Sequence, residues 1–335
     1  MQKYLNRITA SAAALFIVLT SLLPATLAKA ATAPANTGQA LEIAPPLIYL
    51  NVSPGQSAKT QILIRDVSTS PLNVTGQVND FVANGEDGTP KVLLNETKPD
   101  PYSISGWITN VPTLQLVPKQ IKTLSVDINV PANASPGGHY GVIRFTGTAP
   151  SVNGGNGVSL SASIGALMLI TVSGKINENL SVKEFSVSHN GKTGSIFPTW
   201  PLTFTERIAN NGNVHEQPTG LITIKDMFGH VTATLPVNQP PTNILPSSTR
   251  KFTQDLDKTV IGNKRLFGHY SASLKMTYGN PKQTLTAQTG FWVIPFKTVA
   301  IVIALLIVGF FAIRYGIRRY NRSVLERANK PNKKK

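Results

Sequence analysis

Residues 41–290 consist of short runs of alternating apolar and polar side chains separated by turn residues. In residues 60–67 (TQILIRDV), Ile62 and Ile64 point to one side and the intervening side chains to the other. Turn sequences such as Ser-Pro-Gly-Gln at 53–56 separate the runs, and no segment of this region has a helical period. Short strands at roughly 8–12-residue spacing are typical of antiparallel sandwiches. The pattern therefore predicts an all-β fold.

An internal repeat divides this region into two halves. Pro118 is followed 22 residues later by Tyr140, and Pro246 is followed 24 residues later by Tyr270. Both tyrosines end a Gly-His-Tyr sequence. The repeat predicts two tandem immunoglobulin-like β-sandwiches, at residues 41–175 and 176–291. Each tyrosine begins a late strand, which favours a tyrosine corner with its hydroxyl bonded to nearby backbone.

A second constraint is the apolar stretch at residues 298–313 (TVAIVIALLIVGFFAI), which carries no charge. Its eleven Leu, Ile, Val and Phe residues favour insertion into a bilayer by about 3–7 kcal/mol. Sixteen helical residues are shorter than a hydrocarbon core of about 30 Å. We therefore expect one transmembrane helix at 292–313, with Trp292 and Lys297 near the outer boundary. The predicted stop-transfer residues are Arg314, Arg318, Arg319 and Arg322.

Residues 1–30 have the three parts of a secretory signal peptide: a basic start, an apolar stretch at 12–23, and small residues at Ala28 and Ala30 for cleavage. An uncleaved signal anchor is the alternative. Residues 31–40 would be an extended lead-in. With the stop-transfer signal, this predicts a single-pass protein of a bacterial plasma membrane. The body would be extracytoplasmic, and residues 314–335 would form a basic cytoplasmic tail.

The net charge of +16 lies mainly outside the body of the chain. The tail at 314–335 contributes +8 and residues 1–30 contribute +3, which leaves +5 for the rest. The positive-inside bias accounts for the tail, so we do not expect a nucleic-acid partner. The sequence contains no cysteine, which excludes disulfides, thiolate catalysis and cysteine metal sites.

The chain carries no sequence pattern of an enzyme, and we expect neither catalysis nor a cofactor. No G-x-S-x-G, P-loop or dinucleotide fingerprint is present. His215-Glu216 lacks a second histidine at helical spacing, so we expect no metal site there. His139 and His269 occupy equivalent repeat positions, which favours a structural role at strand ends. An unrecognised hydrolase would need clustered histidines and carboxylates in one cleft.

Two groups of residues leave alternatives open. Asp80, Glu86 and Asp87 could supply oxygen ligands for Ca²⁺, but they lack the spacing of a dedicated loop and suit a solvated hairpin tip. Trp107 and Tyr102 could stack on a sugar, although a tryptophan that opens a strand usually belongs to the core.

The ordered series LNVSPGQSAKTQILIRDVSTSPLNVTGQV (50–78) and SGWITNVPTLQLVPKQIKTLSVDINVPANASPGGHYGVIRF (105–145) resembles the WxL-interacting protein family of bacterial cell surfaces. The resemblance covers residues 45–172 and implies a peptidoglycan-binding sandwich. The second half is a weaker match to that family's partner-binding domain. Trp200-Pro201-Leu202 spells the partner's W-x-L signature, and its place in a strand-rich region indicates coincidence.

Two functions remain after this reasoning. The first is a membrane-anchored surface protein that holds peptidoglycan, a partner surface protein, or both, on its tandem sandwiches. The alternative is a structural stalk or assembly scaffold without direct glycan binding. The sequence leaves open the ligand-binding residues, the sandwich face used and the oligomeric state.

Overall fold

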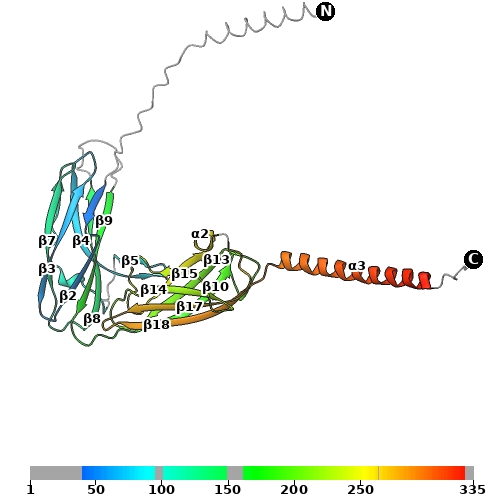
Figure 1. The fold of residues 1–335 in the computed structure, drawn as a ribbon. Helices are drawn as coiled ribbons and strands as arrows, with labels where there is room; N and C mark the ends of the chain where they lie inside the picture. Colours follow the sequence, from blue (N-terminus) through cyan, green and yellow to red (C-terminus); the bar gives the residue numbers. More distant parts are fainter. Residues whose placement is uncertain (1–39, 95–100, 149–160, 263, 329–335) are drawn as a thin grey trace, which may run out of the picture. The chain divides into compact units, whose positions relative to one another are not determined.

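The computed structural model describes residues 40–94, 101–148, 161–262 and 264–328, which form two β-sandwiches and one long helix (Figure 1). The predicted signal peptide, with Ala28 and Ala30, lies outside the described residues.

The first sandwich packs a three-stranded sheet against a six-stranded one. Its strands are β1 (Leu41–Ala44), β2 (Leu47–Val52), β3 (Ser57–Asp66), β4 (Leu72–Asn84), β5 (Thr89–Leu93), β6 (Leu114–Leu116), β7 (Ile121–Asn129), β8 (Gly137–Thr148) and β9 (Ser161–Val172). The smaller sheet has the order β1-β3-β7, and the larger has β2-β9-β8-β4-β5, with β6 also paired to β4. All pairs are antiparallel except β2 with β9.

The second sandwich also packs two sheets, which here have four and five strands. Its elements are β10 (Leu180–His189), β11 (Lys192–Thr193), β12 (Ile196–Phe197), β13 (Leu202–Asn210), β14 (Thr219–Asp226), β15 (Val231–Val237), β16 (Thr249–Leu256), α2 (Lys258–Ile261), β17 (Gly268–Tyr278) and β18 (Gln283–Val293). One sheet has the order β11-β10-β13-β16 and the other β12-β18-β17-β14-β15. The parallel pair of β12 with β18 corresponds to that of β2 with β9. The all-β, two-sandwich fold predicted from the sequence is therefore confirmed.

The repeat extends to single turns. Pro118 and Pro246 each hold the second position of a four-residue turn, closed by Gln120 N donating to Val117 O and by Ser248 N donating to Leu245 O. The next residue has a positive φ in both turns, 66° at Lys119 and 55° at Ser247. Proline followed by a positive φ is the geometry of a type II turn. Both turns lead into equivalent strands, β7 and β16.

The two repeat tyrosines differ in their partners. The hydroxyl of Tyr270 accepts a hydrogen bond from Phe267 N at 3.1 Å, as a tyrosine corner requires. The hydroxyl of Tyr140 instead lies 3.4 Å from Nδ1 of His215, in the second sandwich. The local-backbone role predicted for Tyr140 is therefore wrong, because its partner comes from a residue 75 positions away.

A 3-10 helix, η2 (Ser105–Trp107), closes one part of the first core. The carboxylate of Asp80 holds it, since Oδ1 accepts from Ile104 N at 2.9 Å and from Ser105 N at 3.0 Å. Trp107 is buried in the core, so it is not a sugar-stacking platform.

Helix α3 (Phe296–Ala328) begins later and ends later than predicted. Trp292 belongs to β18, where it pairs with His269. Its backbone N–H donates to Ser195 O at 2.7 Å. The helix starts after Pro295, whose carbonyl accepts from Val299 N at 3.0 Å. Proline favours a helix start because its missing N–H is not needed there. Lys297 therefore lies in the first turn of α3.

The helix is long and apolar enough to cross a membrane. Its segment Phe296–Leu325 contains a window with a mean hydropathy of 2.6, none of it buried against the rest of the chain. The helix passes through the predicted boundary at residue 313 and includes the stop-transfer residues Arg314, Arg318, Arg319 and Arg322. The predicted tail is thus helical as far as Ala328, because no proline interrupts the sequence before that point.

Candidate binding cleft at the junction of the two sandwiches

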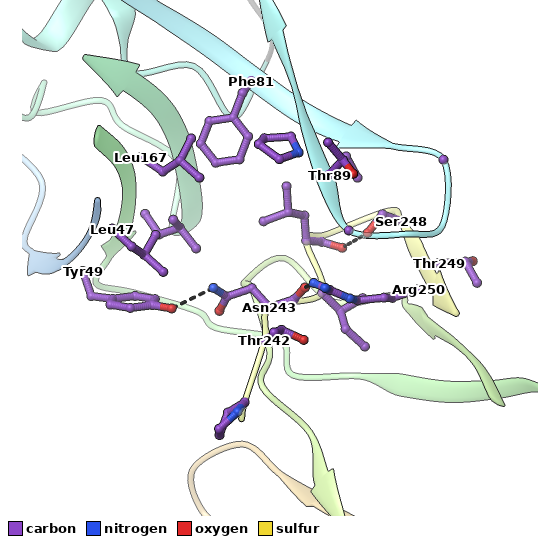
Figure 2. Close-up of a pocket in the computed structure, with 18 residues that line it drawn as sticks. Leu47, Tyr49, Phe81, Thr89, Leu167, Thr242, Asn243, Ser248, Thr249 and Arg250 are labelled. Atoms are coloured by element: carbon purple, nitrogen blue, oxygen red, sulfur yellow. Dashed lines mark hydrogen bonds between the residues drawn. The ribbon is translucent and has the colours of Figure 1, made fainter. Parts of the chain in front are cut away.

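A cleft of about 230 Å³ lies where the two sandwiches meet (Figure 2). Both sandwiches belong to one compact unit. Residues of both line the cleft, so its walls come from segments far apart in the sequence. The first sandwich contributes apolar side chains from β2, β4 and β9, and the second contributes the segment 241–245 and the start of β16. The principal lining residues are Leu47, Tyr49, Phe81, Ala83, Leu167, Leu169, Thr242, Asn243, Leu245, Ser248 and Arg250.

The apolar wall is a small hydrophobic cluster on the outer face of the first sandwich. Phe81, Tyr140, Val142 and Leu169 are buried together, and Leu245 of the second sandwich packs against them. Strand β8 is consequently buried on both faces near the junction. A sheet buried on both sides has apolar residues without alternation. The uninterrupted apolar run at residues 166–170 (ALMLI), on the neighbouring strand β9, is the sequence signal that could have indicated this contact.

Tyr49 joins the two sandwiches through its hydroxyl, which is a donor and acceptor on an otherwise apolar ring. It accepts hydrogen bonds from Gln217 Nε2 and Asn243 Nδ2, both at 2.7 Å. Figure 2 shows the bond to Asn243 at the edge of the cleft. Because these bonds fix the ring, Tyr49 provides a preformed aromatic surface. Sequence reasoning missed Tyr49, whose partners lie more than 160 positions away.

Arg250 places a guanidinium at the cleft, held against the β4–β5 hairpin. Its Nη1 donates to Asn243 O at 2.6 Å, and its Nη2 lies 3.5 Å from Asp87 O. A Cβ on Gly88 would fall 2.1 Å from the guanidinium carbon, and Gly88 has a φ of +79°. The positive φ favours glycine, and a larger residue would also have to displace the guanidinium. Burial lowers the pKa of Arg250, and the nearby charge of Asp87 partly offsets this decrease.

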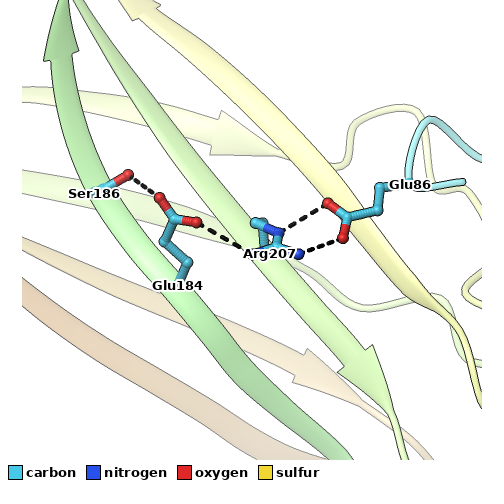
Figure 3. Close-up of polar contacts among 4 residues, drawn as sticks. All are labelled: Glu86, Glu184, Ser186 and Arg207. Carbon is cyan, nitrogen blue, oxygen red and sulfur yellow. Dashed lines mark hydrogen bonds and ion pairs between the residues drawn. The ribbon is translucent and has the colours of Figure 1, made fainter. Parts of the chain in front are cut away.

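An ion-pair network fixes the tip of the same hairpin on β13 (Figure 3). Arg207 Nε donates to Glu86 Oε2 at 2.8 Å, and its Nη2 donates to the other oxygen, which makes the pair bidentate. Arg207 Nη1 also lies 3.5 Å from Glu184 Oε2, and Ser186 Oγ donates to Glu184 Oε1 at 2.6 Å. The hydrogen bond from Arg207 is the main cause that lowers the pKa of Glu86.

The carboxylates considered for Ca²⁺ bond to different parts of the protein. Asp80 holds η2, Glu86 binds Arg207, and Asp87 accepts from Thr89 N at 2.8 Å. Among the described residues, no group of three or more histidine, aspartate or glutamate side chains is placed to hold a metal ion. The hairpin carboxylates therefore act as structural acceptors in this fold.

His215 lies between two aromatic rings at the junction, 5.7 Å from that of Tyr49 and 5.8 Å from that of Tyr140. Burial lowers its pKa to about 4. Burial also raises the pKa of the neighbouring Glu216 to about 7, with a smaller contribution from the charge of Glu178. Both residues border a second, more open cavity of about 580 Å³. Because its pKa is about 4, the ring of His215 is neutral across the physiological pH range.

The repeat histidines have structural surroundings. His139 is buried, with Nε2 at 2.9 Å from Ser135 O and its ring 4.5 Å from that of Trp107. The ring of His269 lies 5.1 Å from that of Trp292. In the W-x-L tripeptide, Leu202 is fully buried in the second core, where it is not accessible to a partner.

No family model matches the sequence, and no curated protein is significantly similar to it. Among solved structures, a chain from the chaperone–tip adhesin complex of CFA/I fimbriae is 16% identical over 75% of this chain and 98% of its own length, with a TM-score of 0.38. A chain from the CsuC–CsuE chaperone–tip adhesin complex of Acinetobacter baumannii is 12% identical over 74% and 97%, with a TM-score of 0.35. The class 5 fimbrial chaperone CfaA is 12% identical over 75% and 99%, with a TM-score of 0.34. Such distant likeness carries no functional argument.

Proposed function

We propose that this chain is a membrane-anchored extracytoplasmic binding protein that holds peptidoglycan in the junction cleft. The observation that carries the proposal is the cleft itself, in which an apolar wall from one sandwich faces amide, hydroxyl and guanidinium groups from the other. Mostly apolar concave sites with a few placed polar groups are typical of ligand sites. The resemblance of residues 45–172 to a peptidoglycan-binding sandwich agrees with this choice.

The chemistry of the cleft matches both parts of peptidoglycan. Tyr49, which is 46% exposed, offers aromatic surface for the apolar faces of sugar rings, and the buried ring of Phe81 supports the apolar wall. Arg250 offers a guanidinium, which pairs well with carboxylates such as those of stem peptides. Asn243 and Thr242 add amide and hydroxyl groups that suit sugar hydroxyls. We infer binding and not catalysis, because these groups supply no activated nucleophile.

Helix α3 supplies the proposed anchor. Its length and hydropathy suit a membrane span, and the arginines that follow residue 313 favour a cytoplasmic C-terminus under the positive-inside rule. Protease added to intact, wall-stripped cells would then digest the sandwiches and spare the terminus. Digestion of the terminus with intact sandwiches would contradict this orientation.

Retention of the full-length, detergent-solubilised protein on purified sacculi tests the ligand. Ala83→Trp would fill the cleft, since Ala83 lies on its wall. Thr234→Trp is the matched control, because Thr234 is exposed on β15 and does not line the cleft. Neither substitution changes the charge, so nonspecific attraction to anionic wall polymers is constant. We expect retention to fall for Ala83→Trp alone. Equal retention of both variants would place any binding elsewhere.

The scaffold alternative has its own supporting observation. In the described part of the chain, β7 is an end strand of its sheet, and Leu63 and Ile121 are exposed beside a groove of about 390 Å³. An end strand with apolar neighbours can pair with a strand of another protein. A photo-crosslinker at Ile121 would then capture a surface protein on intact cells, with no retention of the chain on sacculi. Absence of crosslinks would remove this candidate.

A further inference from the structure

Five of the large, exposed apolar side chains of the second sandwich lie at one end of it. Phe228 is 77% exposed and Phe267 is 62% exposed. Met227, Trp292 and Ile196 are also exposed. We call these five residues the apolar rim. Large exposed apolar groups in contiguous patches mark interaction sites. We therefore expect the apolar rim to contact another molecule.

Strand register shows that the rim residues share one end of the sandwich. Ile196 pairs with Trp292, and the last pair of β14 with β17 is Asp226 with Tyr270. The turn that carries Met227 and Phe228 follows directly, and a Cβ on Gly268 would fall 1.9 Å from the Met227 methyl. The β14–β15 turn, the start of β17 and the end of β18 thus lie together.

The chain itself brings this end to the membrane. Strand β18 ends at Val293 and α3 begins at Phe296, so two residues separate the sheet from the helix. Three residue steps span at most about 10 Å. Whatever direction α3 takes, the rim therefore lies close to the plane where the helix enters the bilayer. Phe296, at the helix start, is also exposed.

The charges around the rim suit anionic headgroups. Lys258, Lys264 and Arg265 are exposed on the segment that precedes β17. The acidic residues nearby bind local backbone: Asp226 accepts from Phe228 N at 2.9 Å, and Asp257 accepts from Thr259 N at 2.9 Å. Aromatic and basic side chains together are typical of segments that lie in a membrane interface.

We propose that the apolar rim rests in the headgroup layer of the membrane that α3 crosses, so that the second sandwich lies against the lipid surface. The proposal rests on the membrane anchoring in the proposed function. It commits to lipid as the occupant, because the rim lies at the exit of the anchor and carries aromatic and basic groups. A second copy of the chain or another protein on the rim would contradict it.

Single-cysteine variants of the full-length chain test the proposal, since the natural sequence has no cysteine. Phe228→Cys probes the rim, and Leu306→Cys probes the centre of the apolar helix. Leu221→Cys is the matched control, because Leu221 is 46% exposed on β14, the strand that leads to the turn with Phe228, and pairs with Lys275 far from the rim. Each variant carries an environment-sensitive dye and is reconstituted in nanodiscs of anionic lipid, with or without spin-labelled headgroups.

We expect the dye to shift to shorter emission wavelengths and to lose intensity to the spin label at positions 228 and 306, with neither change at 221. Insertion at 306 with position 228 behaving like 221 would overturn the rim proposal and leave the anchor intact. No insertion at 306 would overturn both. A wavelength shift at 228 without quenching by spin-labelled lipid would assign the rim to protein contact and also overturn the proposal.

Discussion

Glu206 is a carboxyl group in the centre of the second core. It follows Phe204 and precedes Ile208 in the inward-facing series of β13, and it is fully buried. Neither of its carboxyl oxygens has a hydrogen-bond partner among the described residues. Burial disfavours the charged form of an acid, and it raises the pKa of Glu206 from 4.5 to about 8. The folded protein thus carries a neutral Glu206 at pH 7.

This pKa difference makes stability depend on pH. Between pH 4.5 and 8 the unfolded chain has released the Glu206 proton and the folded chain has not, so the free energy of unfolding falls as pH rises. The slope is about 1.4 kcal/mol for each pH unit. The loss is therefore about 3 kcal/mol at pH 7 and about 4 kcal/mol at pH 8, where the folded group is itself half ionised. Glu206→Gln keeps the shape and removes the titration.

Hydrogen exchange of β13 amides in the full-length chain at pH 5 to 8, corrected for intrinsic exchange rates, measures this effect. We expect wild type and Glu206→Gln to be similar near pH 5 and the variant to be the more stable by several kcal/mol at pH 8. Glu42→Gln, at a carboxylate whose side chain is 60% exposed, is the matched control and is measured in parallel. Parallel stability curves for wild type and Glu206→Gln would refute the reasoning.

Three further predictions concern the first sandwich and the junction. Asp80→Ala leaves the N–H of buried Ile104 without its acceptor and should cost about 2 kcal/mol of unfolding free energy, measured by urea denaturation. Arg207→Met removes the bidentate pair with Glu86 and should speed hydrogen exchange in the β4–β5 hairpin and not in β7, an effect that high salt should reproduce in wild type. His215 has a pKa of about 4 in the fold against 6.5 ordinarily, so its stabilising contribution holds above pH 6.5. About 3 kcal/mol is lost as the pH falls to 4, and His215→Phe should abolish that loss in the same denaturation assay.

The strand pattern and the repeat could be predicted because they depend on local spacing. Ile62 and Ile64 face the first core as their alternation indicates, and the turns at Pro118 and Pro246 are equivalent as the repeat predicts. The helix boundary was predicted less well. Hydropathy ranks Trp292 with the apolar span, but a sheet partner at His269 keeps it in β18.

The cleft could not be predicted, because its walls come from both sandwiches. Tyr49 acquires its hydrogen bonds from Gln217 and Asn243, and Tyr140 acquires its histidine from the second sandwich. Glu206 looks like an ordinary polar position until the register of β13 places it among core side chains.

The strand-rich pattern, the two sandwiches and one apolar helix follow from the amino-acid sequence alone. The reason is that alternation, turn residues and hydropathy act between near neighbours in the chain. The junction cleft, the ionisation states of Glu206 and His215, and the gathering of the apolar rim beside the helix exit required the tertiary structure. Burial and pairing are set by what packs against a side chain, and in these places the packing comes from distant residues.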